Sequence, residues 1–80
     1  MTDSRDRLRA AFRTALGLPA DAAVDDLAYR AIPQWDSVAH MQLVATIEST
    51  FDLMLDTDDV IGMSSFAAAC AIVGKHGVEV

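Results

Sequence analysis

The sequence predicts an all-α protein, a small bundle of three main helices plus one short helix, with a long loop between helices one and two. Apolar residues recur three and four positions apart within residues 8–16, 43–51 and 66–73, which is the period of amphipathic helices. Residues 52–56 alternate as a strand would, but one strand has no partner, so we expect a connecting segment. With 80 residues, 52% of them apolar, we expect a single domain over 1–80.

The composition excludes several classes of function. Twelve acidic residues against six basic ones give a net charge of −6, which opposes contact with nucleic-acid phosphates. No run of apolar residues is long enough to span a membrane. The single cysteine, Cys70, excludes an internal disulfide, and we interpret it as a small residue that fills the core. No pair of Cys and His residues has the spacing of a metal site. We therefore expect a cytoplasmic monomer without nucleic-acid, membrane or metal partners.

The first helix has signals at both ends. Asp3 or Ser4 can cap its start, and Gly17 can adopt the left-handed conformation that ends a helix, while Pro19 opposes a restart. We expect the basic side chains on its other faces to have no role beyond solvation. They are Arg5, Arg7, Arg9 and Arg13.

Residues 18–36 are expected to form a long ordered loop. Pro19 and Pro33 interrupt a stretch of small and polar residues, and Leu27 to Arg30 can make at most one helical turn. Loops of this length are uncommon in compact domains unless they are pinned or functional. The apolar pins are Val24, Leu27, Tyr29, Ile32 and Trp35.

The second helix begins at Ser37 and carries two apolar stripes. The first, expected to face the core, contains Leu43, Val44, Ile47 and Phe51. The second lies on another side and contains Val38, Met41 and Ala45. The second stripe has two interpretations: a partly exposed docking surface, or a face on which Val38 and Met41 pack under the loop.

The remaining helices are short. Thr57 is the expected cap of a brief third helix that ends at Gly62, with Asp58 and Asp59 near its positive end and both facing water. Ser64 or Ser65 caps the last helix. Its core face contains Phe66, Ala69, Cys70 and Val73. We expect His76, in the tail, to be exposed and weakly held.

Two residues of the second helix raise the question of catalysis. Ser37 and His40 are one turn apart, so a nucleophile–base pair is conceivable. The pair lacks an orienting group and an evident oxyanion hole, so we expect His40 to use its polar tip locally and expect no catalytic residue. A serine at this place is ordinarily an N-cap. A helix start also favours an anion, however, which suits a covalently attached phosphate at Ser37.

A family resemblance rests on this region. The segment Trp35-Asp36-Ser37-Val38, at a helix start, resembles the attachment motif of acyl carrier proteins. The resemblance spans nearly the whole chain in order. It takes in the pinned loop, the spacing of Leu43, Ile47, Glu48 and Phe51, the acidic turn of Asp56, Asp58 and Asp59 with Val60 and Ile61, and the final helix from Ser64.

The resemblance implies a non-enzymatic carrier. A phosphopantetheinyl transferase would attach the 4′-phosphopantetheine arm of coenzyme A to Ser37 Oγ, and the arm's thiol would carry acyl groups as thioesters. Partner enzymes of the acyltransferase, ligase or synthase type would read the second helix and its neighbours. By position, the partner-docking residues would be Asp36, Val38, Met41, Ala45, Glu48, Asp56, Asp58 and Asp59.

The chain departs from the fatty-acid carriers of this family. Ala39 and Gln42 stand where those carriers have acids, and His40 is added. These departures, and more weakly Trp35, favour a free-standing carrier of a specialised, polyketide-type pathway. Two alternatives are open: a peptidyl carrier with an aminoacyl cargo, and an unmodified helical interaction domain that binds an amphipathic helix through its second apolar stripe.

Overall fold

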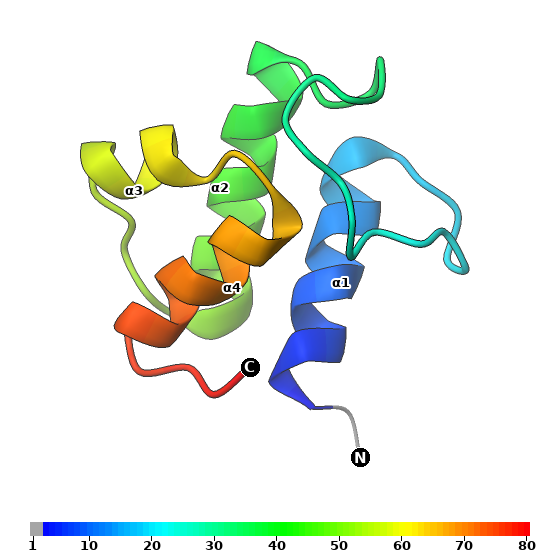
Figure 1. Cartoon of the computed structure of the whole chain (residues 1–80). Helices are drawn as coiled ribbons and strands as arrows, with labels where there is room; N and C mark the ends of the chain where they lie inside the picture. The colour runs from blue at the N-terminus through cyan, green and yellow to red at the C-terminus, as the bar shows by residue number, and fades with distance from the viewer. Residues whose placement is uncertain (1–2) are drawn as a thin grey trace.

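The described part of the chain folds into four helices joined by irregular segments. The computed structural model describes residues 3–80 and contains α1 (Ser4–Leu16), α2 (Ser37–Phe51), α3 (Thr57–Gly62) and α4 (Phe66–Lys75) (Figure 1). The predicted all-α class, with three main helices, one short helix and a long first loop, is confirmed. Residues 53–56 are neither helix nor strand, as expected for a connecting segment. None of the helices in the described range is long and apolar enough to cross a membrane.

The core forms where three helices and the loop meet. α1 packs mainly against α2, and the two run antiparallel (Figure 1). Phe12 of α1 makes edge-to-face contacts with Trp35 of the loop and Phe66 of α4, with ring centroids 5.4 and 5.1 Å apart. The buried core consists of Leu8, Ala11, Phe12, Leu16, Val24, Trp35, Leu43, Ile47, Met63, Phe66, Ala69 and Val73.

Capping residues set the ends of the helices. Asp3 is the N-cap of α1 and Gly17, with φ of 67°, is its left-handed C-cap, both as predicted. α3 begins differently from the prediction: Asp56 is its N-cap and accepts a hydrogen bond from the Asp59 N–H, so Thr57 lies inside the helix. Ser65 caps α4, which continues through Gly74 to Lys75.

The long loop is ordered by pairing as well as by its apolar pins. Val24 and Trp35 are fully buried. The segment from Leu27 to Arg30, which could have made one helical turn, instead pairs with another part of the chain: Ala28 forms an antiparallel bridge with Ser65 at the start of α4. Backbone hydrogen bonds from Tyr29 N to Ser64 O (2.8 Å) and from Phe66 N to Leu27 O (3.0 Å) flank this bridge. The loop is thereby fixed at its middle before it enters α2.

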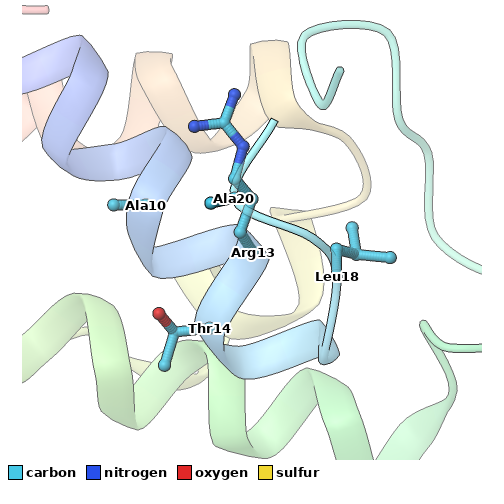
Figure 2. A pocket seen from close by; sticks show the side chains of 5 residues that line it. All are labelled: Ala10, Arg13, Thr14, Leu18 and Ala20. Carbon is cyan, nitrogen blue, oxygen red and sulfur yellow. The ribbon is translucent and has the colours of Figure 1, made fainter. Parts of the chain in front are cut away.

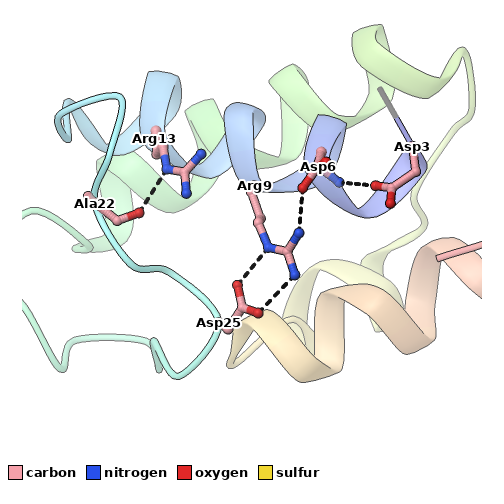
Figure 3. Close-up of polar contacts among 6 residues, drawn as sticks. All are labelled: Asp3, Asp6, Arg9, Arg13, Ala22 and Asp25. Carbon is pink, nitrogen blue, oxygen red and sulfur yellow. Dashed lines mark hydrogen bonds and ion pairs between the residues drawn. The ribbon is translucent and has the colours of Figure 1, made fainter. Parts of the chain in front are cut away.

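Three of the four arginines of α1 do more than solvate the surface, contrary to the expectation. Arg9 binds the Asp25 carboxylate through two nitrogens, at 2.8 and 3.0 Å, and Arg13 Nε donates to the Ala22 carbonyl at 2.8 Å (Figure 3). Arg7 donates to the Thr50 carbonyl and lies over the Phe51 ring. These contacts attach the first half of the loop to α1 and the end of α2 to α1.

Candidate functional site

The N-terminal end of α2 presents Ser37 to solvent. Asp36, not Ser37, is the N-cap, because its carboxylate accepts a hydrogen bond from the Ala39 N–H at 2.9 Å. Ser37 is therefore the first helical residue, and it is exposed. The ordinary interpretation of Ser37 as a cap is wrong, and its hydroxyl is not committed to the helix backbone.

A tyrosine from the loop reaches the serine. Tyr29 Oη lies 3.3 Å from Ser37 Oγ, which makes a long hydrogen bond in which either hydroxyl can be the donor. The Tyr29 ring packs beside His40 and Trp35, with centroid separations of 5.3 and 6.1 Å. The sequence suggested Tyr29 only as an apolar pin, because nothing in its spacing indicates contact with Ser37.

His40 of α2 forms hydrogen bonds to the loop and to α3, and these bonds define the tautomer of its ring. Trp35 Nε1–H donates to His40 Nδ1 at 3.0 Å, and an indole nitrogen can only donate, so Nδ1 is the acceptor and the proton is on Nε2. Nε2–H then donates to the Val60 carbonyl of α3 at 2.8 Å. Both ring nitrogens have partners other than Ser37, which leaves no nitrogen for the conceivable Ser37–His40 pair. The expected local use of the polar tip of His40 is confirmed.

Most of the predicted docking residues lie on the surface. Val38 is 70% exposed and Met41 58%, so the alternative in which they pack under the loop is wrong. The other exposed members of the predicted set are Asp36, Ala45, Asp56 and Asp58. The structure adds two strongly exposed apolar residues, Met54 (83%) and Ile61 (74%), which periodicity did not single out because their segments are too short to define a face.

Two predicted docking carboxylates have structural partners instead. Glu48 is half-buried, and its Oε2 accepts a hydrogen bond from the Leu55 N–H at 2.9 Å, which supports the connection between α2 and α3. Asp59 is only 3% exposed, so the expectation that it faces water and a partner is wrong. Its carboxylate binds Lys75 and, at 2.8 Å, His76 Nε2. His76 is exposed, as expected, but this contact holds its ring in place, contrary to the expectation that it is weakly held.

The partners of Asp59 stabilise its charged form. Hydrogen bonds from Lys75 and His76 lower the pKa of Asp59 from 3.8 to about 2. The hydrogen bond between Lys75 and Asp59 also raises the pKa of Lys75. In the opposite sense, burial raises the pKa of the Cys70 thiol, as expected for a half-buried core filler rather than a reactive cysteine.

A pocket lies elsewhere, on α1 and the beginning of the loop. It has a volume of about 230 Å³, and its lining contains none of the predicted site residues (Figure 2). It is lined by Ala10, Arg13, Thr14, Leu18 and Ala20. Within residues 3–80, no group of three or more His, Cys, Asp or Glu side chains is placed to hold a metal ion.

Comparison with known proteins adds no family assignment. Neither the protein-family models nor the curated proteins contain a match to this chain.

Proposed function

We propose that the chain is a non-enzymatic carrier whose Ser37 bears 4′-phosphopantetheine. The observation that carries the proposal is the exposed Ser37 hydroxyl in the first turn of α2, with the capping task taken by Asp36. The first N–H groups of a helix have no intrahelical acceptor and attract an anion, so a phosphate on this oxygen fits the site. When bound, the arm supplies a thiol that holds acyl groups as thioesters.

The attachment reaction is a phosphoryl-type transfer performed by a phosphopantetheinyl transferase. Ser37 Oγ forms a bond to the phosphorus next to the pantetheine of coenzyme A. The pyrophosphate P–O bond breaks, adenosine 3′,5′-bisphosphate leaves, and a base of the transferase takes the serine proton. The chain's own contribution is to keep Oγ reachable at a fixed end of α2.

The proposed docking surface combines exposed residues of α2 with the start of α3. Val38 and Met41 offer apolar contact on α2, and exposed carboxylates stand before α2 (Asp36) and at the start of α3 (Asp56 and Asp58). Such a surface suits the basic rim of a transferase, acyltransferase, ligase or synthase. The first turn of α2 contains no acidic residue, which favours a carrier of a specialised, polyketide-type pathway over a fatty-acid carrier. We propose that it acts in the cytoplasm as a monomer.

Intact mass spectrometry tests the attachment. Incubation with coenzyme A and a broad-specificity transferase is expected to add the mass of one arm to the protein. Ser37→Ala should gain nothing, whereas Ser49→Ala, which removes an exposed serine from the same helix, should gain the arm as the parent does. The proposal fails if the parent gains no mass with several transferases, or if Ser37→Ala is modified equally.

A second function is favoured by the 70% exposure of Val38. An unmodified interaction domain would bind an amphipathic helix through Val38, Met41 and Ala45, and would keep its partner when Ser37 is replaced by Asn. If the chain is a carrier, Ser37→Asn folds but loses all acyl transport. Measuring partner binding and acyl transport on this one variant therefore separates the two functions.

A further inference from the structure

The hydrogen bond between Tyr29 and Ser37 gives the loop a direct role at the modified atom. In the unmodified chain, either hydroxyl can donate across the 3.3 Å between Oη and Oγ. Once Oγ is esterified to phosphorus it has no hydrogen, so only the phenol O–H can donate. The charged non-bridging oxygens of a phosphodiester, one phosphorus atom beyond Oγ, are stronger acceptors than the ester oxygen.

Tyr29 is held in place from two directions. Its backbone N–H donates to the Ser64 carbonyl at 2.8 Å, beside the bridge between Ala28 and Ser65. Its ring packs beside those of His40 and Trp35, which are themselves tied together by a 3.0 Å hydrogen bond. The phenol oxygen is therefore fixed relative to α2, and donating a hydrogen bond requires little reordering of the side chain.

The surrounding charges make such a donor useful. Asp36 immediately precedes Ser37 and is exposed, so a phosphodiester on Oγ adds a second negative charge beside its carboxylate. One oxygen of Asp36 accepts the Ala39 N–H, which reduces its repulsion but does not remove it. A neutral phenol that donates to the phosphate offsets this repulsion without adding charge.

We propose that Tyr29 is a positioning residue for the phosphodiester: its hydroxyl hydrogen-bonds Ser37 Oγ before modification and a non-bridging phosphate oxygen afterwards. The inference rests on the proposed function. It assigns to the loop, rather than to α2 alone, the task of orienting the first atoms of the arm. The pairing of the loop with the start of α4 holds Tyr29 for this task.

Nuclear magnetic resonance of the loaded protein tests the proposal. The chain contains one tyrosine, so ¹³C labelling at tyrosine Cζ gives a single signal from Tyr29. Loading is expected to shift this signal, because Cζ responds to the hydrogen bond of its hydroxyl. The ³¹P signal of the loaded protein is expected to move by more than its linewidth in Tyr29→Phe, which removes only the phenol oxygen. Loaded Ser49→Ala should keep the parent ³¹P position.

The outcomes separate the two proposals. If the parent protein accepts no arm, the proposed function itself fails. If it accepts the arm but the Cζ signal is the same before and after loading, or Tyr29→Phe leaves the ³¹P signal unmoved, the role of Tyr29 fails and the carrier function stands. If Tyr29→Phe does not fold, the Cζ measurement on the parent decides alone.

Discussion

Two neighbouring residues divide the tasks at the start of α2. Asp36 caps the helix through the Ala39 N–H, and Ser37 shows its hydroxyl to solvent and to Tyr29. Loss of an N-cap oxygen costs about 1 kcal/mol of stability, whereas an exposed residue inside the first turn contributes much less. The residue proposed for modification is therefore not the one that stabilises the helix.

This division predicts a larger loss of stability for one of two alanine variants. Asp36→Ala is expected to lower the free energy of unfolding by about 1 kcal/mol. Ser37→Ala is expected to change it by less than about 0.5 kcal/mol. Urea unfolding followed by circular dichroism measures both. A loss in Ser37→Ala as large as that in Asp36→Ala would mean that the serine caps α2 after all.

At the scale of the element, α2 ends less favourably than it begins. Its C-cap, Asp52, adopts a left-handed conformation with φ of 52°, which glycine adopts without steric cost. Its carboxylate also lies at the negative end of the helix dipole. By contrast, Asp58 lies in the first turn of α3, where a negative charge is favourable.

The two sites predict opposite effects of one type of substitution. Asp52→Gly is expected to stabilise the protein by about 0.5 kcal/mol, because it relieves both unfavourable terms. The control Asp58→Gly removes the same charge but is expected to destabilise the protein, because it places glycine inside a helix and removes a favourable charge. Thermal unfolding of both variants checks the signs, and two shifts in the same direction would contradict this account.

At the scale of the molecule, α3 is held by contacts with its neighbours. Its Val60 carbonyl accepts the hydrogen bond from His40 of α2. Its Asp59 carboxylate binds Lys75 and His76 at the end of α4. A helix of six residues is too short to be stable alone, so these contacts fix its position. They also fix the start of α3, with the acids Asp56 and Asp58, relative to α2 and α4.

The Asp59 contacts predict an acid-labile contribution to stability. The pKa of Asp59 is about 2 in the folded protein, against the ordinary value of 3.8 that applies to the unfolded chain. Because the folded-state pKa is depressed, the stabilisation is fully present above pH 3.8 and is lost as the pH falls toward about 2.

Comparison with Asp59→Asn isolates this contribution. The parent should be more stable than the variant at about pH 7, and the difference should shrink as the pH falls through the window set by the two pKa values. Urea midpoints across this range provide the measurement, with Asp58→Asn as the exposed neighbouring control. A difference that is independent of pH would contradict the assignment of the low pKa to Asp59.

Several features of the fold and site followed from short-range patterns. The bounds of α1 and the start of α2 were predictable because apolar period and terminal residues such as Gly17 act within a few positions. The burial of Leu43 follows from its place on the core stripe of the second helix, whereas periodicity did not give the exposure of Ser37. The start of α3 did not follow from such patterns. Asp56 and Thr57 are both acceptable N-caps by residue type, and only the backbone conformation selects Asp56.

The amino-acid order by itself determined the helices, the loop between the first two, and the serine at the start of α2, since these depend on neighbours in sequence. Only the tertiary structure decided that Tyr29 reaches Ser37 and that Asp59 is buried against Lys75 and His76. The physical reason is that such contacts join residues on different elements. Their geometry is set by how the helices and the loop pack around the shared core, which local periodicity does not encode.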